Sequence, residues 1–210
     1  MSVLGCHCEP KFDGLSRDFK RALWFVIAIN GVMFVIEIFA GAAAGSKALQ
    51  ADALDFLGDT TTYAISLYVI GMSSRARARA ALIKGLSLGA MGTWVLGSTI
   101  YQILVLGVMP QPAIMSGVGL LALAANLGSI ALLMGYKDGD ANVRSVWLCS
   151  RNDAIGNIAV MLAAGAVWLT GTAWPDLIVA VLMAGLFFWS SVQIVHQALS
   201  EQRHSDPAPS

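Results

Sequence analysis

Six long runs of apolar residues fill most of the chain and limit its fold more than any other feature. A helix needs about 20 apolar residues to cross a bilayer, and only helices or closed barrels satisfy every backbone polar group there. Of the 210 residues, 57% are hydrophobic and only 12% are charged, which is far from the balance of a soluble domain. We therefore expect an all-α membrane protein, a bundle of six transmembrane helices at 22–44, 49–72, 82–106, 112–136, 145–170 and 173–197.

The Lys and Arg residues predict the orientation of these spans. Of 13 such residues, 11 lie in the two tails or in the connections that share their side of the membrane, and only Lys47 lies on the other side. This excess marks the cytoplasmic side and predicts that both termini are cytoplasmic. We expect no cleavable signal peptide, because the residues before the first span contain no apolar core. The expected location is a cell membrane, the inner membrane of a bacterium, crossed several times.

The chain divides into one membrane domain and two tails. Residues 1–21 form a cytoplasmic N-terminal tail, residues 22–197 a compact six-helix transport domain, and residues 198–210 a short cytoplasmic tail. Short loops predict that consecutive helices are antiparallel neighbours, and the polar, Pro-bearing end predicts disorder. No nucleic-acid partner is indicated, because the Arg residues after the second span are better explained as a topology anchor near lipid headgroups.

Three aspartates form a stripe on the second span. Asp52, Asp55 and Asp59 are spaced i, i+3 and i+7, so a helix places them on one face. An ionisable group inside a membrane costs roughly 2.5–3.5 kcal/mol even on a lenient scale, so it requires a partner or a function. No Lys or Arg of the same helix can neutralise the stripe. We interpret Asp55 and Asp59 as metal ligands and Asp52 as a supporting or relay carboxylate.

The fifth span offers a second pair of ligands. Cys149 and Asp153 are four residues apart and share a helix face, and Asn157 lies one turn further along that face. Two such pairs on facing helices would close a tetrahedral metal site. For the pairs to meet in depth, this helix must begin near residue 140 or 142. Two alternatives remain open: Cys149 is a ligand or a packing residue, and Asn157 orients a ligand or joins two helices.

Three further charged residues stand inside or at the ends of spans. Glu37 is a buried carboxylate of the first span and a candidate supporting or relay group, like Asp52. Arg151 is interpreted as a structural ion-pair partner, with Glu37 as its most interesting candidate. Asp176 opens the sixth span and is expected to cap that helix.

A short motif near the N-terminus carries two of the three cysteines. Cys6, His7 and Cys8 could capture a soft metal weakly, although so short a motif has low specificity. Because these thiols would lie on the reducing side of the membrane, disulfides are not expected.

The sequence resembles the first, second, fifth and sixth helices of cation diffusion facilitators. The resemblance rests on the stretch from Phe34 to Asp59, with its Ala-Asp-Ala and Asp-x-x-x-Asp elements, on Asp153-Ala-Ile-Gly and on Trp174-Pro175-Asp176. It implies a proton-coupled exporter of a divalent transition metal, usually zinc, that works as a homodimer. The implied site is Asp55, Asp59, Cys149 and Asp153. Members often have His where this chain has Cys149, and many continue into a cytoplasmic domain that we do not find after the last span.

Together these features predict a transporter and not an enzyme. We expect export of Zn²⁺, or of Cd²⁺ or another soft divalent ion, by proton antiport with alternating access. The thiol argues against Mg²⁺ and Ca²⁺, which prefer oxygen ligands. The alternatives are a membrane-embedded metalloenzyme and a metal-sensing membrane protein that transports nothing. Against the enzyme, no candidate nucleophile or general base stands beside the ligands.

Overall fold

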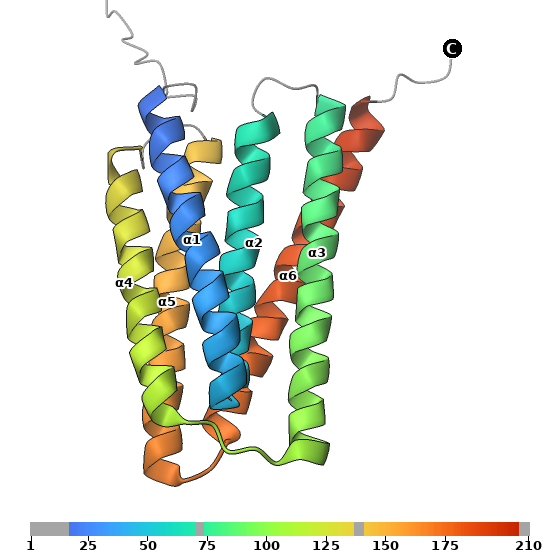
Figure 1. Cartoon of the computed structure of the whole chain (residues 1–210). Coiled ribbons are helices and arrows are strands. Elements are labelled where there is room, and N and C mark those ends of the chain that lie inside the picture. The colour runs from blue at the N-terminus through green and yellow to red at the C-terminus, as the bar shows by residue number, and fades with distance from the viewer. Residues whose placement is uncertain (1–16, 70–73, 137–140, 206–210) are drawn as a thin grey trace, which may run out of the picture.

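Six long helices run side by side in the computed structural model, which describes residues 17–69, 74–136 and 141–205 (Figure 1). No strand occurs in these ranges, so the all-α prediction is confirmed. One π-helical turn, Gln102–Leu106, follows the third helix, and one 3₁₀ turn, Met134–Tyr136, follows the fourth. The helices are α1 Arg17–Ala44, α2 Lys47–Val69, α3 Ser74–Tyr101, α4 Pro112–Leu133, α5 Ala141–Thr170 and α6 Trp174–Ser205.

The two ends of the bundle differ in what they carry. Helix α1 begins and α6 ends at one end, which we call the terminal end, and the α1–α2, α3–α4 and α5–α6 connections lie at the other, which we call the loop end (Figure 1). Helix α5 begins at Ala141, as the depth of its two predicted ligands requires. Helix α6 continues to Ser205 and α1 begins at Arg17, so both helices extend beyond the predicted spans, and the domain boundaries at 21 and 197 stay a prediction. Glu, Gln and Arg at 201–203 favour helix without burial.

Five of the six helices meet the length and apolarity needed to cross a membrane, counting the described residues only. Helix α2 falls short, because its stripe of three aspartates lowers its mean hydropathy. It nevertheless lies alongside the other five in the bundle (Figure 1). The six predicted spans therefore correspond to six helices, of which the polar one is α2.

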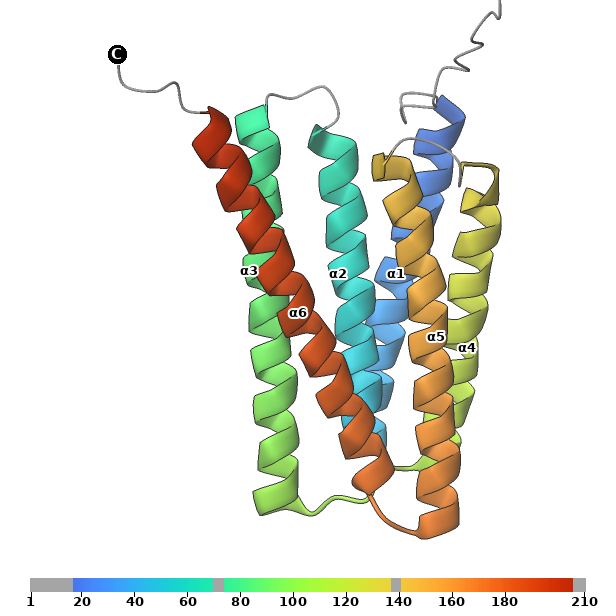
Figure 2. The same ribbon diagram turned by 180° about the vertical axis from the view of Figure 1, so that it is seen from behind.

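The helices separate into a group of four and a pair. Helix α1 packs on α2 and α4, α4 packs on α5, and α2 also meets α5, whereas α3 packs chiefly against α6 (Figure 2). Glycines let α3 and α6 approach closely: a Cβ at Gly85 would lie 2.8 Å from Val195, and the Ser191 hydroxyl donates a 2.7 Å hydrogen bond to the Gly85 carbonyl. Helix α2 contacts both groups and therefore stands at their junction.

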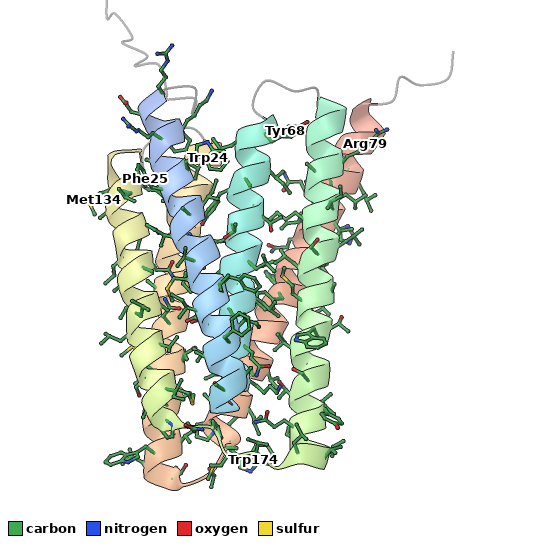
Figure 3. All side chains as sticks on the ribbon, viewed as in Figure 1. Trp24, Phe25, Tyr68, Arg79, Met134 and Trp174 are labelled. Atoms are coloured by element: carbon green, nitrogen blue, oxygen red, sulfur yellow. The ribbon has the colours of Figure 1, made fainter. Side chains whose placement is uncertain are left out.

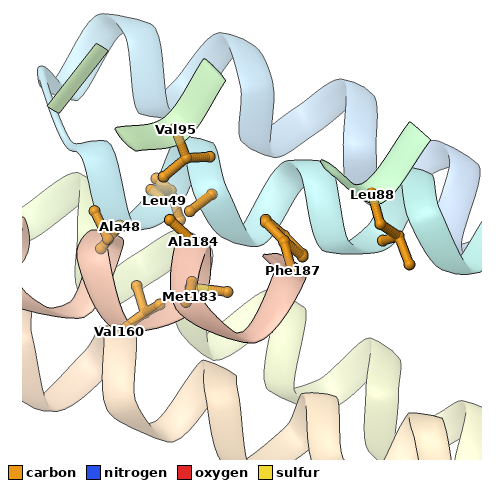
Figure 4. Close-up of a cluster of buried hydrophobic side chains, with 10 residues drawn as sticks. Ala48, Leu49, Leu88, Val95, Val160, Met183, Ala184 and Phe187 are labelled. Carbon is orange, nitrogen blue, oxygen red and sulfur yellow. The ribbon is translucent and has the colours of Figure 1, made fainter. Parts of the chain in front are cut away.

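An apolar cluster fills this junction near the loop end. It joins Leu49 of α2, Val95 of α3, Val160 of α5 and Phe187 of α6, each nearly excluded from solvent (Figure 4). Large apolar side chains elsewhere point outward along the helices, as expected of surfaces that face lipid (Figure 3). Exposed aromatic residues stand at both ends, with Trp24 at the terminal end and Trp174 at the loop end (Figure 3), where membrane interfaces favour them.

The turn between α1 and α2 is closed by capping contacts. Gly45 adopts φ +66°, and the Ser46 amide donates to the Gly41 carbonyl at 3.0 Å while the Gly45 amide donates to the Ala42 carbonyl at 3.3 Å. This is a Schellman end, which needs a residue able to take positive φ. The Ser46 hydroxyl then accepts from the Leu49 amide at 3.0 Å and caps α2. The start of α2 is thereby fixed to the end of α1.

Asp176 completes this cap from a different helix. Its carboxylate is fully buried and accepts from the Ser46 hydroxyl at 2.6 Å, from the Lys47 amide at 2.8 Å and from the Ala48 amide at 3.1 Å. The expectation that Asp176 caps its own helix was wrong, because its oxygens bind the free amides of α2. The acid therefore ties the first turn of α6 to the first turn of α2.

Two glutamines add further contacts at the loop end. The buried Gln102 side chain donates to the Gly45 carbonyl at 3.0 Å, and the backbone amide of Gln111 donates to the Ala44 carbonyl at 2.9 Å. Both contacts connect the segment after α3 with the α1–α2 turn. The polar groups at this end are thus largely paired.

Candidate metal centre

The aspartate stripe of α2 points into the group of four helices. Asp52 is 1% exposed, and Asp55 and Asp59 are half-buried. Asp55 and Asp59 lie eight and twelve residues after Lys47, or about 12 and 18 Å along the helix from the loop end. In a hydrocarbon core about 30 Å thick, that is close to the middle of the membrane.

Helix α5 brings a third carboxyl group to this level. The side chains of Asp55 and Asp59 each lie within hydrogen-bonding reach of Asp153, which is half-buried. Three of the four predicted ligands, from two facing helices, therefore come together. Within the described residues, no group of three or more His, Cys, Asp or Glu stands in an arrangement that could hold a metal ion. The Cys149 side chain lies outside the described residues, so the four-ligand assignment stays a prediction.

Two residues near Asp59 escaped the sequence analysis. The Tyr63 hydroxyl donates a hydrogen bond to Asp59 Oδ2, and Tyr63 is fully buried in an apolar cluster with Phe19 and Leu23. Lys84 of α3 lies near enough to act electrostatically on Asp59. The i+4 spacing from Asp59 to Tyr63 was a usable signal, whereas only the packing of α3 could reveal Lys84.

Glu37 and Asp52 form a second acidic group nearer the loop end. Both are almost completely buried, and their carboxyl groups lie within hydrogen-bonding reach of each other across α1 and α2; apart from that contact, both Glu37 oxygens and Asp52 Oδ2 lack a hydrogen-bond partner. The Arg151 side chain lies outside the described residues, so its proposed pairing with Glu37 stays a prediction. The relay role predicted for Glu37 and Asp52 stays a prediction.

Three buried asparagines surround the acidic groups. Asn30 donates to the Val26 carbonyl of its own helix at 2.8 Å, whereas both amide atoms of Asn126 and of Asn157 lack a hydrogen-bond partner. Asn157 was predicted from its position on the ligand face of α5. Asn126 was missed, although an isolated amide in the apolar α4 sequence was a signal. An unsatisfied buried polar group costs about 1–3 kcal/mol, so these amides favour a polar or cationic guest.

The N-terminal motif Cys6, His7 and Cys8 lies outside the described residues. Its weak capture of soft metal therefore stays a prediction.

The fold and site define an integral membrane helical bundle with an acidic centre at mid-depth. A family model described as the cation efflux transmembrane domain matches residues 23–201. The metal cation efflux system protein CzcD of Cupriavidus metallidurans is 27% identical over 180 residues, covering 78% of this chain and 55% of that protein. Zinc transporter ZitB of Escherichia coli is 25% identical over 199 residues, covering 89% and 64%, and that of Yersinia pestis is 26% identical over 200 residues, covering 90% and 64%.

These matches establish the family. Because the family model covers most of the chain, this protein belongs to the cation efflux family, the cation diffusion facilitators. The resemblance seen in the sequence is thereby confirmed. The chain spans between 55% and 64% of the length of these relatives.

Proposed function

We propose that this protein exports a divalent transition-metal cation, with Zn²⁺ as the first candidate, in exchange for protons. The observation that carries the proposal is the meeting of Asp55 and Asp59 with Asp153 across α2 and α5, near the middle of the membrane. Two relatives named as a metal cation efflux protein and a zinc transporter support it. The protein acts as a transporter and not as an enzyme.

The proposed ligands are Asp55, Asp59, Cys149 and Asp153. Carboxylate oxygens with one thiolate suit Zn²⁺ or Cd²⁺ better than Mg²⁺ or Ca²⁺. Without metal, several carboxylates in one low-dielectric site cannot all be ionised, so some hold protons. Metal binding then releases protons, and proton binding releases metal. Alternating access between the two membrane faces turns this competition into antiport.

The orientation follows from the distribution of charge. The terminal end carries the excess of Lys and Arg, and we assign it to the cytoplasm of a bacterial cell, with the loop end outside the inner membrane. Metal would enter from the terminal end and leave at the loop end. The homodimer implied by the family resemblance belongs to this proposal, and cross-linking in mild detergent would test it.

Flux measurements test the proposal against its rivals. Purified protein in proteoliposomes should carry Zn²⁺ against a counterflow of protons, with Cd²⁺, Co²⁺, Fe²⁺ and Mn²⁺ compared under the same conditions. A metal-sensing protein would bind metal without flux, and a metalloenzyme would turn over a substrate without moving the ion. Absence of metal-dependent proton flux with every ion would refute the antiporter.

A further inference from the structure

Glu37, Asp52 and Asn157 present five buried polar atoms that have no hydrogen-bond partner apart from the contact between the two carboxyl groups. The three side chains are at most 1% exposed, and the unpartnered atoms are both Glu37 oxygens, Asp52 Oδ2 and both amide atoms of Asn157. The loop end of the same molecule pairs its buried polar groups closely. Buried polar atoms without partners are concentrated on α1, α2 and α5, and we expect them to bind a ligand.

The register of α1 against α2 places the two acids at one level. A Cβ at Gly41 would lie 3.0 Å from Gln50, and one at Gly31 would lie 3.9 Å from Thr60. The helices are antiparallel, so Glu37 stands opposite the turn that contains Asp52 and Asp55. The side-chain contact between Glu37 and Asp52 agrees with this register.

The register of α5 against α2 brings Asn157 to the same level. Asp153 reaches Asp55 and Asp59, and Val160 packs in the cluster with Leu49. Asn157 lies between Asp153 and Val160 at i+4 from the first, on the face that α5 turns to α2. Asn157, whose amide is buried and unpartnered, thus lies at the level of the turn of α2 that carries Asp52.

We propose that Glu37, Asp52 and Asn157 form a second cation subsite, between the candidate metal centre and the loop end. Its ligands are two carboxylates and one amide oxygen, and its guest is a divalent cation. The inference rests on the proposed function and adds a second binding site on the path of the ion. The subsite lies about 7 Å from the centre, taking the rise of α2 from Asp52 to the midpoint of Asp55 and Asp59.

The chemistry of the ligands determines the metal affinity and selectivity of this subsite. An all-oxygen site holds soft ions less tightly than a site with a thiolate and accepts harder ions such as Mn²⁺. Two divalent ions so close would repel each other, so one ion would pass from the tighter site to the weaker one. Several sites of moderate affinity along one path let an ion bind and still be released.

A cation accounts for the group better than a proton does. Among the described residues, the charged groups that act on Glu37 are Asp52 and Asp55, both acidic. A proton shared by Glu37 and Asp52 would leave the amide of Asn157 unpartnered. A cation can gather oxygens from all three helices at once.

Mn²⁺ binding, followed by electron paramagnetic resonance on the full chain in lipid nanodiscs, tests the subsite. The centre is first disabled by Asp59→Asn with Asp153→Asn. We expect this protein to keep one weak Mn²⁺ site, and the further change Glu37→Gln, or Asp52→Asn, to weaken it at least tenfold. Thr99→Val is the matched control, because it removes a buried polar group of α3 that bonds only its own helix at Val95.

Two results would overturn the subsite. One is that the disabled centre leaves no Mn²⁺ binding, and the other is that both Glu37→Gln and Asp52→Asn leave the affinity within twofold of the parent. Metal flux through the otherwise unchanged protein separates this failure from that of the proposed function. Flux with no second Mn²⁺ site would refute the subsite alone, whereas a Glu37-dependent site without flux would refute the transport alone.

Discussion

Buried polar groups are hydrogen-bonded at the loop end, whereas several of them lack hydrogen-bond partners in the interior of the four-helix group. At the loop end, the carboxylate of Asp176 accepts three hydrogen bonds and Gln102 binds the α1–α2 turn. In the interior, Asn126 and Asn157 are as deeply buried and have no hydrogen-bond partner. Buried polar groups that are hydrogen-bonded hold helices together, whereas buried polar groups without partners can bind a ligand. The difference separates residues of stability from residues of function.

The largest expected effect comes from the interior. Asp59→Ala or Asp153→Ala should abolish metal transport, at least a hundredfold, because each removes one of four proposed ligands. The folded bundle should persist, since neither carboxylate caps a helix. Flux in proteoliposomes, with thermal unfolding in detergent as the control, measures both. Transport at the parent rate by either variant would refute the site assignment.

Asp176→Ala should do the reverse and act on stability. The substitution leaves the Lys47 and Ala48 amides and the Ser46 hydroxyl without their acceptor, and each unsatisfied buried group costs about 1–3 kcal/mol. We expect a loss of several kcal/mol in unfolding free energy, and a smaller loss for Asp176→Asn, which keeps one acceptor oxygen. Unchanged thermal stability of the alanine variant would show that the inter-helix cap contributes little, and would remove the contrast between the two regions.

Cys149 tests whether the centre contains a soft ligand. Cys149→His should keep four ligands but reduce the preference for Cd²⁺ over Zn²⁺ about tenfold, because imidazole is harder than thiolate. Cys149→Ser should lose most metal affinity. Competition binding of the two ions measures the ratio. If the serine variant binds and transports both ions as the parent does, Cys149 is a packing residue.

The smallest effect is expected at Tyr63, which lies one helical turn from Asp59 on the side of the terminal end. Tyr63→Phe removes the hydrogen bond to Asp59 and keeps the ring in its apolar cluster, a change of about 1 kcal/mol. Transport should change a few-fold, with little effect on unfolding. A loss as large as that of Asp59→Ala would show that the hydroxyl does more than position the carboxylate.

Local patterns in the chain were enough for much of the fold. Runs of apolar residues predicted six helices, and the depth of Cys149 and Asp153 predicted the early start of α5 that the structure confirms. The i, i+4 spacing predicted that Asp55, Asp59 and Asp153 share one site, and Asp153 does lie near both residues of α2, while the ligand assignment stays a prediction. These inferences succeed because helical periodicity and the cost of a charge in lipid act within a single helix.

What the sequence by itself determined is the class of fold and the family, whereas the aspartates of the candidate centre are a prediction from it. Only the tertiary structure decided which helix Asp176 caps, that Lys84 lies near Asp59, and that Glu37 lies beside Asp52. Each of these depends on the register between two different helices. Register is set by side-chain packing over whole helix faces, such as the glycine contacts of α1 with α2 and of α3 with α6. No local pattern carries that information.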